Sequence, residues 1–464
     1  MTFISLQFLV FFMVVSLWFF RLKNQKGRIW LLLIASCYFY MTFIPQYILI
    51  LGGTIVVDYI AGMLIEQSEG RLRKFWLIMS LVANIGVLAV FKYYNFFIDN
   101  IHTGFQFFGK PISLPVLKMA LPIGLSFHTF QAMSYTIEVY RGNQKSERNF
   151  VVYALYVMFY PQLVAGPIER PQNVLPQLKE FRPYNWDNVK EGLARMLWGF
   201  FKKVVIADRL AIATERTFTF THDSSSLALF IGAVFYSFQI YCDFSGYSDI
   251  ALGAAKVMNI RLMENFNQPY LSKGISEFWS RWHISLSSWF RDFVYIPLGG
   301  NRKGPWRRRL NIMIVFLLSG LWHGANWTFV VWGVLHGLLV ALFAFGAKKN
   351  TGANSGIINA AKVAGSFLLV TMLWIFFRSP NIVAGWTYIK KTCSFIGGSN
   401  YVVLNRVEVA FSVLLIIIML LRERLLKTHL IASNGKFYFY TAMMVIICYY
   451  FGVFKENQFI YFQF

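Results

Sequence analysis

Apolar runs of membrane-spanning length recur along this chain and constrain its fold more than any other feature of the sequence. A helix that crosses a bilayer needs about 20 predominantly apolar residues. The candidate spans are 3–20, 29–43, 45–62, 75–94, 118–137, 151–165, 192–207, 226–242, 312–345, 361–377, 407–421 and 438–454. Because the run at 312–345 is long enough for two helices, we predict an all-α polytopic membrane protein with roughly ten to twelve transmembrane helices and some re-entrant segments.

The distribution of charge supports a membrane protein and argues against a nucleic-acid partner. Only 14% of the residues are charged, yet the net charge is +23, because Lys and Arg collect in short loops between the apolar runs. Such loops are typical of the cytoplasmic side, which places loops 21–28, 71–74 and 141–148 inside and the nearly uncharged loop 95–117 outside. Basic loops also bind anionic lipid headgroups. The apolar start is expected to be a retained span rather than a signal peptide.

Two segments in the middle of the chain cannot be ordinary spans. Residues 161–190 contain five prolines, and residues 265–310 combine prolines with closely spaced glycines. Proline breaks helices, and irregular backbone at membrane depth persists only where protein or water satisfies its polar groups. We therefore expect these segments to form a protein-lined central cavity, within a single membrane domain that covers residues 1–464.

The segment 319–327 places a histidine, His323, in one of the most apolar stretches of the chain. Burial there favours the neutral ring, which keeps a nitrogen able to accept a proton. Gly320 and Gly324 would let a substrate or another helix approach the same helix face. His323 is therefore either a catalytic base or a histidine that hydrogen-bonds a neighbouring helix, and Trp322 and Asn326 are candidates to line a substrate cavity.

A second segment, 277–287, interleaves aromatic and charged residues, as interfacial and re-entrant segments do. His283 could line the same cavity as His323, and Glu277, Arg281 and Trp282 are further candidates to contact a substrate. The alternative is an interfacial belt in which Trp and Arg anchor to headgroups. Such a belt explains the tryptophans better than it explains His283 or Glu277.

A third segment, 241–249, ends an apolar run with two carboxylates and several hydroxyls. Tyr247 and Asp249 are candidates for orienting a histidine or binding a polar substrate, whereas Asp243 is more simply explained as a helix cap. Cys242 could carry an acyl thioester, but packing is the simpler role. The sequence has no metal-ligand spacing, serine nucleophile elbow or nucleotide-binding glycine loop, so we expect no metal site and no permanently bound cofactor.

At these segments the chain resembles the membrane-bound O-acyltransferase family. Residues 322–324, Trp-His-Gly, resemble its hallmark histidine motif, and residues 278–283 resemble its second histidine motif. The resemblance extends over about 90–345 and includes segments 122–130, 163–170, 244–249 and 265–270. Within the family the chain most resembles the branch that O-acetylates alginate and other bacterial polysaccharides. The D-alanyl branch typically has Asp-Arg-Tyr-Arg where residues 169–172 read Glu-Arg-Pro-Gln here.

The resemblance implies a ring of helices with a thinned centre, where a cytoplasmic acyl donor and an exported acceptor meet near His323. It implies that His323 is the general base, that acetyl-CoA is the acyl donor, and that His283 polarises the carbonyl or guides the donor. It further implies the bacterial inner membrane, a periplasmic or extracellular SGNH-type acetyltransferase partner with a Ser-His-Asp triad, and polysaccharide export machinery. The alternatives are a D-alanyl or other acyl transferase for cell-envelope polymers, a transporter or flippase for a polar substrate, and a scaffold for a polysaccharide synthase.

Overall fold

The computed structural model describes residues 1–110, 112, 114–119, 121–164, 166–343, 356–394, 404–425 and 433–454. All regular elements in these residues are helices, which confirms the all-α prediction. The helical runs long and apolar enough to cross a membrane are Tyr47–Gln67, Gly70–Phe107, Ser226–Val257 and Gly356–Arg378, and shorter apolar helices are Leu6–Arg21 and Trp327–Phe343. The number of ten to twelve spans stays a prediction.

The chain divides into two compact units. Unit 1 comprises residues 1–193 and 251–263, and unit 2 comprises residues 194–250 and 264–464. The division falls inside α10 (Trp186–Phe200) and α12 (Ser226–Val257), so each of these helices contributes to both units. A single membrane domain over the whole chain stays a prediction.

Unit 1 consists of helices that largely match the predicted spans. They are α1 (Leu6–Arg21), α2 (Gln25–Met41), α3 (Tyr47–Gln67), α4 (Gly70–Leu88), α6 (Leu125–Arg141), α7 (Phe150–Met158), α8 (Tyr160–Leu163) and α9 (Pro171–Lys179). The predicted span 151–165 is interrupted, because Pro161 would clash with the carbonyl four residues earlier if α7 continued. Ala165, and residues 344 and 345 of another predicted span, lie outside the described residues.

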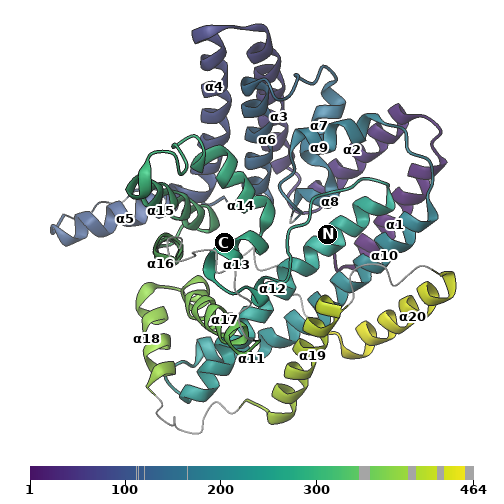
Figure 1. Ribbon diagram of the computed structural model, residues 1–464. Helices are drawn as coiled ribbons and strands as arrows, with labels where there is room; N and C mark the ends of the chain where they lie inside the picture. Colours follow the sequence, from purple (N-terminus) through teal and green to yellow (C-terminus); the bar gives the residue numbers. More distant parts are fainter. Residues whose placement is uncertain are drawn as a thin grey trace. The chain divides into compact units, whose positions relative to one another are not determined.

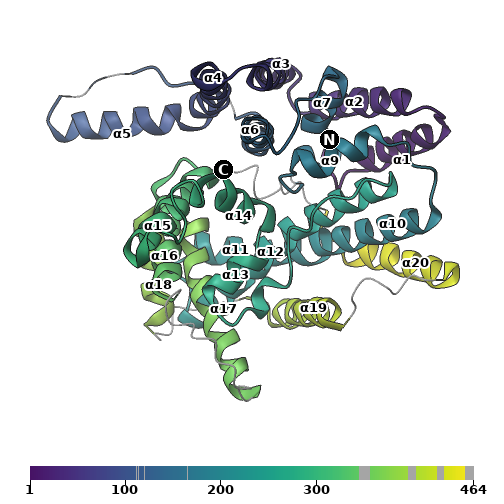
Figure 2. The same ribbon diagram turned by 45° about the horizontal axis from the view of Figure 1, so that its top comes forward.

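A buried carboxylate ties α3, α4 and α6 together in unit 1. Asp58 on α3 accepts hydrogen bonds from Ser80 Oγ (2.6 Å) and Asn84 Nδ2 (2.8 Å) on α4. Ser80 Oγ also lies 3.1 Å from Thr136 Oγ1 on α6, and the three helices lie side by side (Figures 1 and 2). Polar groups of neighbouring helices thus satisfy one another in apolar surroundings, as they do between membrane helices.

The segment 95–117, predicted as an outside loop, contains a helix. A π turn, η1 (Ala89–Tyr93), continues α4 into α5 (Tyr94–Phe107), which points away from α3, α4 and α6 in Figure 2. None of the described α5 side chains is buried. The prediction of a loop is therefore wrong for α5. The physical reason is that a helix growing from a preceding helix avoids the cost of nucleation and needs no buried face to begin.

Unit 2 contains a series of short elements between long helices. Its elements are η2 (Phe201–Ala207), α11 (Asp208–Thr219), η3 (Pro269–Leu271), α13 (Ile275–Arg281), α14 (Ile284–Phe290), η4 (Arg291–Tyr295), α15 (Gly304–His323), α16 (Trp327–Phe343), α17 (Gly356–Arg378), α18 (Ile382–Cys393), α19 (Arg406–Leu425) and α20 (Asn434–Phe451). The segment 265–310 is broken into short helical elements of three to seven residues before α15 begins, as the proline and glycine pattern predicts.

The helices α15 and α16 form a closely packed hairpin in unit 2 (Figure 1). A Cβ atom on Gly320 of α15 would lie 2.4 Å from the Phe329 carbonyl oxygen, and one on Gly333 of α16 would lie 2.4 Å from the Phe316 carbonyl oxygen. Both distances are shorter than van der Waals contact. Gly320 is predicted to allow the close approach of a substrate or another helix, and the structure shows a helix, α16, at this position. His323 lies at the turn of the hairpin.

We expect Gly320→Ala to destabilise the protein by about 1–3 kcal/mol, because the new methyl group forces α15 and α16 apart. Thermal unfolding in detergent measures the effect. Gly365→Ala on α17 is the matched control, since a Cβ atom there would meet no atom within 4 Å, and it should leave stability equal or higher. Equal melting temperatures for the Gly320 variant and the wild type would contradict the close packing.

Candidate functional site

His323 ends α15 inside a cluster of aromatic rings. The helix stops there because Gly324 adopts extended backbone (φ −166°, ψ 153°). The imidazole is 3% exposed. Its centroid lies 4.9 Å from Trp322, 5.1 Å from Trp332 and 5.2 Å from Phe377. The ring is thus held in apolar walls contributed by α15, α16 and α17.

His283 lies between α13 and α14 in the left-handed conformation, with φ 44° and ψ 55°. A residue with a side chain rarely adopts this conformation, and it persists where surrounding contacts hold it. The imidazole is fully buried. Its Nδ1 lies 3.1 Å from Asn265 Oδ1, and its centroid lies 6.1 Å from Trp322. The structure therefore brings the two candidate histidines to the same tryptophan.

A third histidine, His336, joins this cluster, although its position in the sequence predicts only a packing residue. Trp279 Nε1 donates a hydrogen bond to His336 Nδ1 (3.2 Å). The centroid of the Trp332 ring lies 4.9 Å from that of His336 and 5.6 Å from that of Trp279. Trp332 is fully buried, and its ring contacts both His323 and His336. The sequence signal that could have identified His336 is its spacing from Trp332, one helical turn away in an apolar helix.

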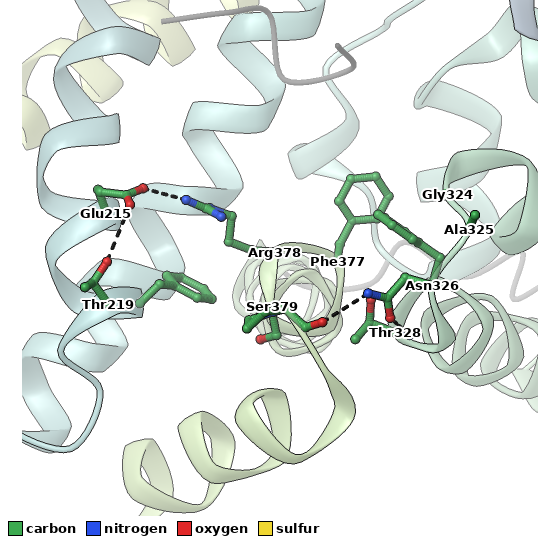
Figure 3. Close-up of a pocket in the computed structure, with 12 residues that line it drawn as sticks. Glu215, Thr219, Gly324, Ala325, Asn326, Thr328, Phe377, Arg378 and Ser379 are labelled. Carbon is green, nitrogen blue, oxygen red and sulfur yellow. Dashed lines mark hydrogen bonds and ion pairs between the residues drawn. The ribbon is translucent and has the colours of Figure 1, made fainter. Parts of the chain in front are cut away.

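A large cavity with a mixed polar and apolar lining opens beside His323. It has a volume of about 670 Å³ and is lined by α11, the turn 324–326, the start of α16 and residues 377–380. Arg378 Nη2 pairs with Glu215 Oε2 (2.5 Å), and Asn326 Nδ2 donates to the Pro380 carbonyl (3.0 Å) (Figure 3). We call this space the Arg378 cavity. Phe377, which contacts the His323 ring, belongs to its wall, so the histidine lies directly behind the lining.

A second cavity, largely apolar, lies along α15. It has a volume of about 210 Å³ and is lined by α13, α14, η4, α15 and α16. Ser319, one helical turn before His323, and Trp279 are part of its lining, and Arg291 and Tyr295 contribute from η4. We call this space the Arg291 cavity. The broken segment 265–310 thus lines a cavity, as expected, while its central position in the molecule stays a prediction.

The other candidates of the segment 277–287 make contacts with other residues of the protein that account for them structurally. Glu277 and Arg281 form an ion pair (2.6 Å) one turn apart on α13. Trp282 is 1% exposed and lies 5.0 Å from Trp374. The interfacial belt is wrong for Trp282, because its ring is covered by protein rather than exposed to headgroups.

Asn326 accepts a hydrogen bond from the Thr328 backbone N–H (3.0 Å) and so begins α16.

The third segment lies within a buried network of ion pairs. Asp249 accepts from Lys202 Nζ (2.5 Å) and Arg195 Nε (2.9 Å), and Asp243 accepts from Lys203 Nζ (2.7 Å). Tyr247 lies beneath Lys203, 5.9 Å from ring centroid to Nζ. The capping explanation of Asp243 is wrong, because α12 continues to Val257 and both carboxylates lie mid-helix. The two lysines come from the π turn η2 and Arg195 from α10, and π turns are frequent at functional sites.

Cysteines and metal ligands add no chemistry to these residues. Cys242 is fully buried, and its Sγ lies 3.9 Å from Met419 Sδ, which fits the packing role. Within the described parts of the chain, no group of three or more His, Cys, Asp or Glu side chains could hold a metal ion. The imidazole of His323, enclosed by the rings of Trp322, Trp332 and Phe377, can accept a proton in surroundings that exclude water.

A model of the membrane-bound O-acyltransferase family matches residues 54–378. Probable alginate O-acetylase AlgI of Pseudomonas aeruginosa is 40% identical over 400 residues, which are 85% of this chain and 75% of that protein. Peptidoglycan O-acetyltransferase of Helicobacter pylori is 35% identical over 399 residues, 80% of this chain and 75% of that protein. Teichoic acid D-alanyltransferase of Bacillus subtilis is 29% identical over 240 residues, 49% of this chain and 60% of that protein. The matched region contains both histidines.

We expect Asp249→Asn to lower stability by about 3–5 kcal/mol, because it leaves the buried Lys202 ammonium without its carboxylate. Adding Lys202→Met should recover part of the loss, since no uncompensated charge then remains. Thermal unfolding in detergent measures both variants. Asp99→Asn on the exposed α5 is the matched control and should unfold as the wild type does. A single variant as stable as this control would show that the ion pair does not support the fold.

Proposed function

Because this chain belongs to the membrane-bound O-acyltransferase family, we propose that it passes acetyl from a cytoplasmic thioester donor, acetyl-CoA, across the membrane for O-acetylation of an exported polysaccharide such as alginate. The chain is an O-acyltransferase and a multi-pass membrane protein. The observation that carries the proposal is the pair of buried histidines that meet at Trp322.

His323 acts as the general base in this proposal. A ring nitrogen takes the proton of an acceptor hydroxyl while the oxygen attacks the thioester carbonyl. The new ester C–O bond forms, the C–S bond breaks, and the imidazolium returns its proton to the leaving thiolate. Thioester and alcohol thus become ester and thiol without net proton release. The rings of Trp322, Trp332 and Phe377 keep out water, which would otherwise take the acetyl group.

The two cavities support separate routes for donor and acceptor. The Arg291 cavity adjoins η4 and α15, and α15 begins with a basic run at 307–309, of the kind that is typical of the cytoplasmic side. We assign it to the acyl donor, whose phosphates are anionic. The Arg378 cavity, with its carboxylate, guanidinium, amide and hydroxyl groups, suits a hydroxyl-bearing acceptor.

The setting of the reaction is part of the proposal. We place the chain in the bacterial inner membrane, beside polysaccharide export machinery and a periplasmic or extracellular SGNH-type partner that completes transfer to the polymer. The names of two acetyl-transferring relatives, each matched over at least 80% of this chain, support an acetyl group. The D-alanyl relative, matched over 49% of it, makes D-alanyl transfer the second candidate.

We expect His323→Ala to lower O-acetylation of the secreted polysaccharide by about 10²- to 10⁴-fold at unchanged polymer yield, because base catalysis is worth that much. The acetyl content per sugar measures it, with equal protein in the membrane. His102→Ala on the exposed α5 is the matched control and should acetylate normally.

Any other result of the His323→Ala experiment points to a different function. Unchanged acetylation in the His323 variant would exclude the base and leave a transporter, or a scaffold that tolerates loss of both histidines. Normal polysaccharide acetylation together with lost D-alanyl esters on the envelope would keep the histidine and change the substrate.

A further inference from the structure

Asn265 is a buried residue between α12 and η3 whose side chain reaches the turn that carries His283. It is 1% exposed. Its Oδ1 receives the Ser285 backbone N–H (3.2 Å) and the Ser285 hydroxyl (2.9 Å), and it lies 3.1 Å from His283 Nδ1. Its Nδ2 donates to Ser248 Oγ on α12 (3.4 Å). Three groups of one turn thus converge on a single side-chain oxygen.

This convergence determines the protonation of His283. A backbone N–H can only donate, so the atom of Asn265 that faces Ser285 is the oxygen, and the network identifies it. An oxygen acceptor 3.1 Å from His283 Nδ1 requires a proton on that nitrogen. In the neutral ring the other nitrogen, Nε2, then carries the lone pair.

The backbone of Asn265 holds the same turn. Its carbonyl accepts the Ile284 N–H (2.9 Å), and the Asn267 N–H donates to the Arg281 carbonyl (2.9 Å). These two hydrogen bonds hold the chain on either side of His283, which has the left-handed conformation. The side chain of Asn265, together with the backbone of residues 265 and 267, thus holds both the strained turn and the ring that it presents.

We propose that Asn265 is a positioning residue of the acyl-transfer site, which holds His283 as the Nδ1–H tautomer so that Nε2 accepts a hydrogen bond from an amide N–H of the thioester donor. The inference rests on the proposed function. It assigns His283 to guiding the donor rather than polarising the carbonyl, because a neutral ring without a proton on Nε2 cannot donate to a carbonyl oxygen from that nitrogen.

His283 contacts Phe244 of α12 and follows α13. The carboxylates of these two helices are Asp243 and Asp249 on α12 and Glu277 on α13. Each of the three carboxylates contacts a cation, namely Lys203, Lys202 and Arg281 in the same order. A carboxylate at position 265 would therefore be a new charge at hydrogen-bond distance from Nδ1.

Nitrogen-15 NMR of histidine-labelled protein tests the tautomer without any assay of activity. The signal of His283 is identified by its loss in His283→Gln. We expect the Nδ1–H pattern in the wild type and in Asn265→Asp, and loss of that pattern in Asn265→Ala. An Nε2–H pattern in the wild type would overturn the proposal, whatever the enzyme transfers.

Kinetics with acetyl-CoA test the role in transfer. Asn265→Ala should raise KM for acetyl-CoA about 3- to 10-fold, the worth of one hydrogen bond, with a smaller change in kcat. Asn265→Asp should keep KM near the wild-type value at high pH and move the acid limb of kcat/KM upward by about one to two pH units, because the new carboxylate favours the imidazolium. An unmoved limb with an intact tautomer signal would overturn the role in positioning.

A structural control separates positioning from folding. Asn311 is also a fully buried asparagine of unit 2, and its Nδ2 donates to the Gly300 carbonyl (2.9 Å). Asn311→Ala should lower the melting temperature while leaving the His283 signal and the acid limb unchanged. If His323→Ala retains acetyl transfer while the tautomer stands, the proposed general base fails and the assignment of the turn survives. The two failures are therefore distinguishable.

Discussion

A polar group that is withdrawn from water has to find its partner inside the protein, and this requirement shapes both units of the chain. In unit 1 the Asp58 carboxylate receives donors from Ser80 and Asn84 on the next helix. In unit 2 the two lysines of the π turn η2 reach carboxylates in the middle of α12. The desolvation cost of a lone buried charge is several kcal/mol. These helices therefore have little freedom to slide, and the site inherits its geometry from that restraint.

The sequence reveals the features that depend on local composition, and it conceals those that depend on distant partners. Apolar runs place nearly every long helix, and prolines with glycines locate the broken segment 265–310, because these signals act within a few residues. Position in an apolar stretch also singles out His323. By contrast, Asp249 forms an ion pair with Lys202, which is distant in sequence. From the sequence alone, carboxylates in the middle of a helix therefore resemble the residues that end one. Asn265 escapes notice for the same reason, since its role appears only when the chain returns at Ser285.

Aromatic side chains form the walls of the candidate site. Trp322, Trp332 and Phe377 surround His323, and Trp279 links the same cluster to His336. Indole and phenyl rings fill space and lose little conformational freedom when buried. The histidine nitrogens and the indole N–H groups are the polar atoms among these rings. The Arg378 cavity and the Arg291 cavity both adjoin this cluster, because Phe377 lines the first and Trp279 lines the second.

The π turn η2 also has a consequence for how the protein is made. A π turn shifts the hydrogen-bond ladder and frees backbone carbonyls, and here the Val204 carbonyl accepts the backbone N–H of Val453 (2.8 Å). Val453 follows α20, so this acceptor leaves the ribosome long before its donor is translated. During that interval the lysine-bearing turn has its ion pairs with α11 and α12, and the backbone contact with Val453 is added only when α20 has been made. The timing of translation thus becomes a part of how the support beneath the site is assembled.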